Sequence, residues 1–328
     1  MEWYHYITAC IYIVLILGGV VINGGFILLF TFSREIRKAV NPFMVSLAVS
    51  DILFPLVVVP FHLQHLISGT WKYGVLGCKL RTFAYLVTAS ASILSFCSVS
   101  VARFLRIIYP FRFNMIHDKT VWTTALLLWL YSFGSSAFVF AADTFQRSQI
   151  QKHSSCFHFL PIDLFIPLFL LNYCAPLLVM LSIYGCILKL SWRHRKQISH
   201  TRVSPANLAT NSRAKKASKQ LVTVFLLLSY FGEWWLPISG LSLRLKTQYN
   251  SELDWPRWTA PVYQFLSISV FLNSVVNPFV YGYSNTHLKA TLRHLIRKRS
   301  SKGNLLSTQL TTFVVPSHLP SSQPQPKA

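Results

Sequence analysis

Residues 42–67, PFMVSLAVSDILFPLVVVPFHLQHLI, form an apolar run of 26 residues that contains one carboxylate, Asp51, and no lysine or arginine. As a helix rising ~1.5 Å per residue, this run exceeds the ~30 Å hydrocarbon core of a bilayer. A carboxylate in the middle of such a run is costly in lipid and is retained where it faces the inside of a bundle. The stretch therefore predicts a membrane helix packed against other helices.

Six further apolar runs of at least 20 residues are long enough to cross a bilayer. They comprise residues 6–32, 80–108, 121–141, 162–190, 221–243 and 260–283. Only 12% of the 328 residues are charged, whereas soluble domains carry about 25%. We therefore predict an all-α membrane protein, a seven-transmembrane helix bundle over residues 6–283. The first run is longer than a secretory signal and follows no Lys or Arg, so we interpret it as a membrane helix.

The 31 Lys and Arg residues are distributed unequally between the two sides of the predicted membrane, 23 on one side and eight on the other. The positive-inside rule places the richer side in the cytoplasm. Residues 1–5 are then a short extracellular N-terminus, residues 189–219 a basic third intracellular loop region, and the C-terminus is cytoplasmic. We expect a multi-pass protein of the plasma membrane. A net charge of +22 distributed in this way follows membrane topology and does not indicate a nucleic acid partner.

Two of the six cysteines lie on the predicted outer side. Cys78 precedes the third apolar run, and Cys156 lies in the polar loop before the fifth. Disulfides persist in the oxidising compartment that this side faces, so a Cys78–Cys156 disulfide is expected, with two unpaired thiols as the alternative. The other four cysteines lie in or near apolar runs and are interpreted as packing residues.

Asp51 has polar residues on other apolar runs as potential partners. They are Asn23 in the first run, Ser92 in the third, and Asn273 and Asn277 in the seventh. A carboxylate among hydroxyls and amides offers the oxygen ligands that a small hard cation prefers, so a sodium ion at Asp51 is one hypothesis. A structural, hydrogen-bonded carboxylate is the other, and the residues alone do not decide between them.

One characteristic residue or motif on each apolar run, in chain order, resembles the rhodopsin-like (class A) G-protein-coupled receptor family. The set is Asn23; Leu47-Ala48-Val49-Ser50-Asp51; Trp71-Lys72-Tyr73-Gly74; Cys78; Arg103; Trp129; Pro176; Tyr184; Trp235-Leu236-Pro237; and Asn277-Pro278-Phe279-Val280-Tyr281. Each motif alone is weakly specific, but the ordered set extends from residue 6 to about residue 297. The resemblance implies seven membrane helices. Apolar residues on one face and basic residues elsewhere predict a short amphipathic eighth helix at residues 284–298, and a composition rich in Ser, Thr, Pro and Gln predicts a disordered cytoplasmic tail at residues 299–328.

The resemblance also implies a signalling mechanism, with a ligand that shifts a two-state bundle toward its active state. Movement around the toggle residues is passed to a connector and opens a cleft for a heterotrimeric G-protein. The implied toggle and connector residues are Trp235, Pro237, Pro176, Ile93 and Phe231, and the implied coupling residues are Arg103, Tyr184 and Tyr281. Arrestin and receptor kinases are further implied partners, because the tail contains several Ser and Thr residues.

The sequence departs from the family pattern directly before Arg103. The family carries an acidic residue at this position, and this chain carries Ala102, followed by Arg103 and Phe104. Residues 189–219 also contain no Asp or Glu, so the usual acidic partner near the inner end of the sixth helix is missing. Two hypotheses follow: raised ligand-free activity, or an atypical scavenger receptor with weak or absent G-protein coupling.

The ligand pocket is expected in the outer half of the bundle. Its expected lining is Tyr12, His65, Arg81, Tyr85, Leu86, Ile238, Ser239, Ser242, Tyr263, Gln264 and Ser267. Tyr85 occupies the position where amine receptors carry an aspartate, and Phe271 the position of the retinal lysine in visual pigments. An aromatic pocket with Arg81 at its mouth favours a lipid acid, or a peptide with a free carboxylate, over an amine. Alternatively, Arg81 extends to the membrane interface.

Other classes of protein find no support in the sequence. No internal repeat of the kind found in secondary transporters is present. No metal-ligand spacing, nucleotide-binding loop or nucleophile–base arrangement suggests an enzyme. Apart from the possible sodium ion, we expect no cofactor.

Overall fold

The computed structural model describes ten helical elements and several short linking segments. Its described residues are 3–39, 41–113, 115–142, 156, 162–199, 237–245, 247–248, 256, 258–284, 290–291, 293–294 and 297. The long helices are α1 (Trp3–Phe32), α3 (Pro42–Ser68), α4 (Gly74–Ile108), α6 (Asp118–Ala142), α9 (Ala175–Ser199) and α11 (Thr259–Ser284). The shorter ones are α2 (Arg34–Ala39), α5 (Pro110–Phe113), α8 (Ile162–Phe169) and the π-helix η1 (Leu170–Cys174). Residues 237–245 are also helical.

Five helical segments among the described residues are long and apolar enough to cross a membrane: Tyr6–Phe32, Pro42–Ser68, Gly74–Arg106, Asp118–Ala141 and Leu164–Ile187. They coincide with the first five predicted runs to within a few residues. The seventh predicted run coincides with α11. The sixth run, residues 221–243, lies outside the described residues up to residue 236, and its remainder is helical.

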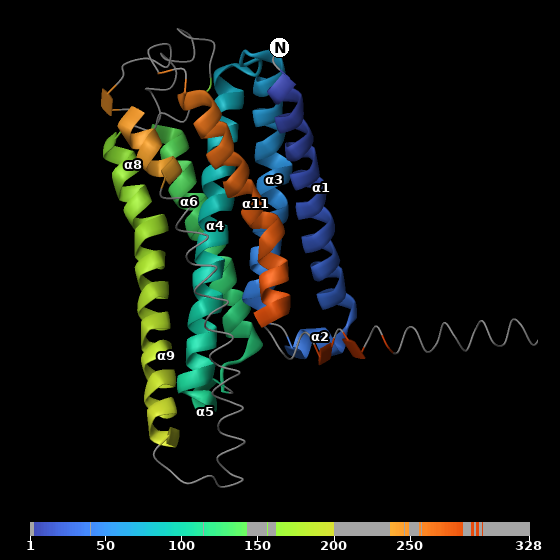
Figure 1. The fold of residues 1–328 in the computed structure, drawn as a ribbon, viewed down its shortest axis with the longest axis vertical. Coiled ribbons are helices and arrows are strands. Elements are labelled where there is room, and N and C mark those ends of the chain that lie inside the picture. The colour runs from blue at the N-terminus through green and yellow to red at the C-terminus, as the bar shows by residue number, and fades with distance from the viewer. Residues whose placement is uncertain are drawn as a thin grey trace, which may run out of the picture.

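The long helices stand side by side in a bundle, and the short α2 lies across one end of it (Figure 1). Helix α4 is the central element, because it packs against α3, α6, α9, α5 and η1. Helix α1 packs against α3 and α11, which closes that side of the bundle. Most of the length of α4 therefore lies among neighbouring helices.

Buried hydroxyl groups join the helices at the centre of the bundle. The Trp129 indole nitrogen of α6 donates to the Ser46 hydroxyl of α3 at 3.0 Å. Ser46 also shares a 2.8 Å hydrogen bond with Ser95 of α4. Small polar residues permit close helix–helix approach, and hydrogen bonds between helices stabilise a bundle in lipid. The three helices are thereby fixed to one another at this level.

The fifth membrane segment is interrupted by one π-helical turn. The Ala175 amide donates to the carbonyl of Leu170, five residues earlier, and the π-helix spans Leu170–Cys174. Pro176 follows directly and has no amide hydrogen, so it cannot complete the regular pattern of an α-helix. The predicted run 162–190 is therefore helical throughout, but its two parts, α8 and α9, are joined by a wider turn. Such turns occur frequently at functional sites.

Three predicted segments lie largely outside the described residues. Helix α9 continues to Ser199 and so covers the start of the predicted region 189–219. Within the predicted eighth helix, residues 290–291, 293–294 and 297 are helical. The predicted tail at 299–328 is not described.

Candidate functional site

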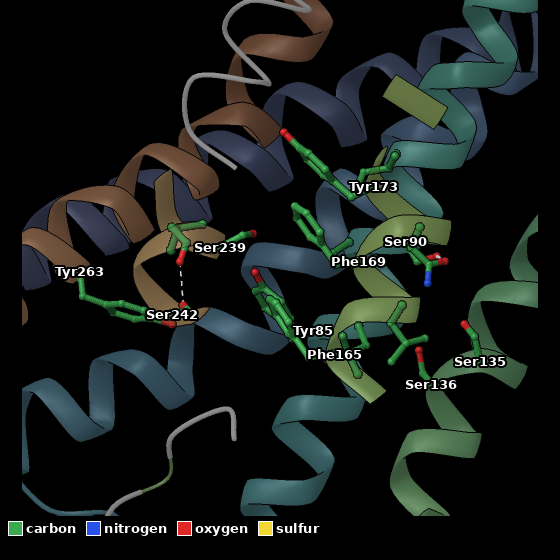
Figure 2. Close-up of a pocket in the computed structure, with 16 residues that line it drawn as sticks. Tyr85, Ser90, Ser135, Ser136, Phe165, Phe169, Tyr173, Ser239, Ser242 and Tyr263 are labelled. Carbon is green, nitrogen blue, oxygen red and sulfur yellow. Dashed lines mark hydrogen bonds between the residues drawn. The ribbon is translucent and has the colours of Figure 1, made fainter. Parts of the chain in front are cut away.

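A cavity of about 130 Å³ lies between α4, α6, α8, η1, α11 and the helical residues 237–245. Figure 2 shows its sixteen lining residues, with Tyr85, Phe165 and Phe169 directed toward the same space. The lining comprises Tyr85, Leu86, Ala89, Ser90, Ile93, Ser135, Ser136, Phe165, Leu168, Phe169, Asn172, Tyr173, Ile238, Ser239, Ser242 and Tyr263. None of these side chains is ionic. The cavity can therefore hold an apolar ligand and hydrogen-bond to it through hydroxyl and amide groups.

A line of hydrogen bonds forms the polar wall of this cavity. Ser132 of α6 donates to the hydroxyl of Ser90 on α4 at 3.2 Å, and Ser90 donates to the Asn172 carbonyl oxygen on η1 at 2.8 Å. The hydroxyl hydrogen of Ser90 is thus used within the protein. The amide nitrogen of Asn172 makes no hydrogen bond to the described residues, so it can donate to a ligand in the cavity.

An aromatic stripe on α8 and η1 forms another part of the wall. Phe165, Phe169 and Tyr173 follow one another at four-residue spacing, and their rings stack at centroid distances of 5.8 and 5.0 Å. Neither this stripe nor the contribution of α6 was predicted from the sequence. The four-residue spacing was a detectable signal, since such residues share a helix face. The sequence offers no comparable signal for Ser135 or Ser136.

Six of the eleven predicted pocket residues line the cavity: Tyr85, Leu86, Ile238, Ser239, Ser242 and Tyr263. The other five, Tyr12, His65, Arg81, Gln264 and Ser267, do not. Tyr12 is buried between helices instead, with its ring 5.7 Å from that of Phe271 on α11. Ser267 is likewise buried on α11.

Arg81 occupies neither of the two positions expected for it. Its side chain is 6% exposed, so it does not extend to the interface. One terminal nitrogen donates to the Cys156 carbonyl at 2.8 Å, and the other lies 2.8 Å from Nε2 of His62. The guanidinium also lies 5.8 Å from the Trp71 ring. Arg81 therefore fixes the disulfide-bonded loop to α3 and α4, and His62 is a partner that the sequence did not indicate.

The predicted disulfide is confirmed. Cys78 on α4 is bonded to Cys156, and both residues are buried against Trp71. The Trp71 indole donates to the Gly74 carbonyl at 2.7 Å. Gly74 has a φ of +61°, a conformation that favours glycine, at the first residue of α4. This turn brings the start of α4, and with it Cys78, against Cys156.

The structure gathers three of the five predicted sodium-site residues in one hydrogen-bonded group. Asp51 accepts hydrogen bonds from Asn277 at 2.8 Å and from Ser92 at 3.2 Å, and it is 2% exposed. Asn23 lies fully buried nearby in the bundle and donates to the Ser274 carbonyl at 2.8 Å. Asn273 is half-buried and makes no hydrogen bond to Asp51.

Asn23 makes no described contact with Asp51, but its side-chain oxygen is of the kind that a small hard cation binds. The side-chain oxygen of Asn23 is buried and accepts no hydrogen bond. A buried carbonyl oxygen without a donor is unfavourable, and a cation is one group that would satisfy it. Each Asp51 oxygen also retains a lone pair beyond its single described donor.

The predicted connector and coupling residues lie along α4 and α9. Ile93 and Tyr173 pack together in a small buried cluster, and the Cys97 thiol lies 3.9 Å from the Pro176 carbonyl. Further along, the Tyr184 hydroxyl donates to Ser100 at 3.0 Å, and Arg103, half-buried, follows one turn later. Trp235 and Phe231 lie outside the described residues. Pro237 begins a described helical segment, and Tyr281 lies in α11 with its side chain undescribed.

Ala102, the residue that departs from the family pattern, is buried. It belongs to the largest apolar cluster among the described residues, with Phe43, Met44, Val99 and Tyr184 among its members. Its exposed fraction is 7%. The position before Arg103 therefore faces packed side chains of α3, α4 and α9.

The bundle of long apolar helices, the loop disulfide at one end and the cavity beneath it define a multi-pass membrane protein of the seven-helix receptor class. The family model "7 transmembrane receptor (rhodopsin family)" matches residues 22–281. The chain belongs to this family, is a receptor rather than an enzyme, and has the seven-transmembrane helix bundle as its fold.

Individual relatives are similar to the chain at a low level of sequence identity. Mouse cysteinyl leukotriene receptor 2 is 26% identical over 298 residues, which cover 88% of this chain and 90% of the relative. Chicken lysophosphatidic acid receptor 6 is 25% identical over 232 residues, 68% of this chain and 71% of the relative. The [Phe13]-bombesin receptor of Bombina orientalis is 28% identical over 286 residues, 82% and 70% respectively.

Proposed function

We propose that the chain is a plasma-membrane receptor that converts binding of an extracellular ligand into activation of a heterotrimeric G-protein. The observation that carries this proposal is the cavity near the disulfide-bonded end of the bundle, whose lining includes Ile93 and Tyr173. These residues pack together on α4 and η1, close to Pro176. Both helices continue from there to Tyr184, Ser100 and Arg103. A ligand in the cavity therefore touches the same two helices that carry the coupling residues.

The proposed orientation places the N-terminus outside the cell and the C-terminus in the cytoplasm. The Cys78–Cys156 disulfide supports it, because disulfides persist on the side exposed to an oxidising compartment. The excess of basic residues at the other end of the helices supports the same orientation. Arrestin and receptor kinases are proposed partners of the tail at 299–328.

A lipid acid or a peptide is the proposed class of ligand, in preference to an amine. The lining residues that the structure describes include no carboxylate to pair with an amine, and Tyr85 is one of them. The names of two relatives refer to leukotrienes and lysophosphatidic acid, and that of a third to the peptide bombesin. The aromatic stripe and the single available amide of Asn172 suit a ligand that is mostly apolar.

The proposal is tested by expressing the chain and measuring activation of each G-protein class without ligand. Activation above that of cells without the receptor supports a coupling receptor. Surface expression with no activation in any class, together with uptake of bound ligand into the cell, supports the alternative scavenger receptor. The scavenger alternative is supported by Ala102, because the family pattern has an acidic residue at this position and this chain lacks it.

Replacing Ala102 with aspartate is expected to lower ligand-free activation about five- to thirty-fold. An added carboxylate beside Arg103 would stabilise the inactive state by ~1–2 kcal/mol as a charge-assisted hydrogen bond, which changes a two-state ratio by that factor. Because Ala102 is buried, surface expression is measured in parallel and activation is normalised to it. Ala102→Asn is the control, because asparagine has nearly the same size as aspartate and carries no charge. Equal activation of all three chains would show that Ala102 does not set the basal level.

We further propose that a sodium ion binds at Asp51, with Ser92, Asn277 and Asn23 as its neighbours. Sodium chloride is expected to raise the Tm by about 2–5 °C over equal choline chloride, since a ligand specific to the folded state stabilises it. The increase should disappear in Asp51→Asn. Asp118→Asn, which removes an exposed carboxylate at the start of α6, should retain it. An equal increase in Asp51→Asn would instead favour a purely structural Asp51.

A further inference from the structure

A second, smaller hollow of about 10 Å³ adjoins the main cavity on the side of α4 and α6. Its lining comprises Lys79, Thr82, Phe83, Leu86, Ser136, Val139 and Phe140. Leu86 and Ser136 also line the main cavity. These two side chains, one from each helix, therefore form the boundary between the two spaces.

The residues that α4 contributes to both spaces lie along one face of that helix. Lys79, Leu86, Ser90 and Ile93 are separated by seven, four and three residues, spacings that keep residues on one helix face. At ~1.5 Å per residue, Lys79 lies about 10 Å above Leu86 and about 21 Å above Ile93. The two spaces thus follow one face of α4 over about 21 Å, and Leu86 and Ser136 separate them.

The small hollow lies next to the outer surface of the helix bundle. Phe83 packs against Phe133 and Phe140 of α6, at centroid distances of 5.0 and 5.9 Å. Phe133 is 56% exposed on the bundle surface. On a membrane-spanning bundle, that surface contacts lipid chains, so the hollow is next to the hydrocarbon region.

Lys79 supplies a cationic group that the main cavity lacks. The Lys79 side chain is half-buried, and its Nζ lies 5.6 Å from the Phe140 ring centroid, at the edge of the small hollow. Arg81, the other nearby cation on α4, is directed to the Cys156 carbonyl and His62. Arg81 lines neither space, whereas Lys79 lines the small hollow, so Lys79 is the described basic residue nearest to a group bound there.

We propose that the ligand is a single-chain lipid with an anionic headgroup that reaches the cavity laterally, between α4 and α6. The headgroup binds Lys79, and the chain passes between Leu86 and Ser136 to the aromatic stripe of α8 and η1. This inference rests on the proposed receptor function and specifies its ligand class. Passage of the chain requires Leu86 to change rotamer, which a flexible leucine at the boundary permits.

The test uses the full-length chain in phosphatidylcholine nanodiscs and an oleic acid probe with a diazirine at the end of its chain. Unlabelled oleic acid, oleoyl lysophosphatidic acid and uncharged oleyl alcohol compete with photolabelling of the protein. Saturable labelling is expected at Phe165–Tyr173 on α8 and η1. Lys79→Gln is expected to weaken competition by both acids at least tenfold, the effect of losing a hydrogen bond to a charged group, and to leave oleyl alcohol unchanged. Lys79→Arg should restore competition by the acids.

Lys72→Gln is the matched control, because Lys72 is an exposed basic residue on the same side that lines neither space. A stronger effect on one acid than the other identifies a carboxylate or a phosphate headgroup. Unchanged competition by both acids in Lys79→Gln, an equal loss for the alcohol, or labelling that does not saturate would overturn the inference. Because G-protein activation plays no part in this assay, failure of the receptor proposal would be seen separately.

Discussion

Replacing Arg103 with alanine is expected to reduce ligand-free G-protein activation to the level of cells without the receptor. Arg103 lies near the C-terminal end of α4, one turn beyond Ser100, to which the buried Tyr184 donates a hydrogen bond. In the rhodopsin-like family, this arginine lines the cleft that receives the G-protein, so its loss removes a contact made by the active state. Activation is measured for each G-protein class at matched surface expression.

Arg106→Ala is the control for this prediction. Arg106 is exposed three residues further along α4, and its guanidinium lies 4.8 Å from the Phe113 ring on α5. Its removal takes the same charge from the same end of the same helix, and activation should persist. If both variants lost activation equally, general basicity of this end would explain the result, and Arg103 would have no specific role.

Removing the disulfide is expected to lower the free energy of unfolding by about 2–5 kcal/mol, the usual range for a native disulfide. The Cys78→Ser, Cys156→Ser double variant should show a Tm about 5–15 °C lower in detergent. The loss should be at the high end of this range, because the disulfide and Arg81 attach the loop to α4 at neighbouring points. When the loop is released, the buried Arg81 also loses its Cys156 carbonyl partner.

Cys186→Ser is the matched control, since Cys186 is an exposed free cysteine on α9. Its Tm should change by less than about 1 °C, as is usual for surface substitutions. Arg81→Gln, with the disulfide intact, should give an intermediate loss. A double cysteine variant as stable as the unmodified chain would mean that packing around Trp71 holds the loop without the covalent bond.

Length and hydropathy were sufficient to predict the membrane helices, because each run must cover the same hydrocarbon thickness. The observed helix boundaries differ from the predicted ones where residues at a helix end make local interactions. Helix α4 begins six residues before the predicted start, at Gly74, where the Trp71 indole bonds to the chain. Helix α6 begins at Asp118, an acidic residue in its first turn, a position that the helix dipole favours.

The candidate site was predictable only in part, for a physical reason. Tyr85 and Leu86 line the cavity, and their prediction as pocket residues followed from the position of α4 in the family pattern. Arg81 does not, since its direction depends on the Cys156 carbonyl, which is 75 residues away in the sequence. The contribution of α8 also depends on the π-helical turn, and hydropathy does not detect such a turn.

That single wide turn sets the angular phase between the two parts of the fifth membrane segment. One residue corresponds to a rotation of about 100° in an α-helix, so winding the same five residues Leu170–Cys174 as α-helix, with none deleted, would rotate one part against the other by about that angle. With α8 held by the cavity, Tyr184 would turn away from Ser100, although no residue of either site had changed. The number of residues in this turn thus sets the rotation of Tyr184 relative to the cavity residues of α8.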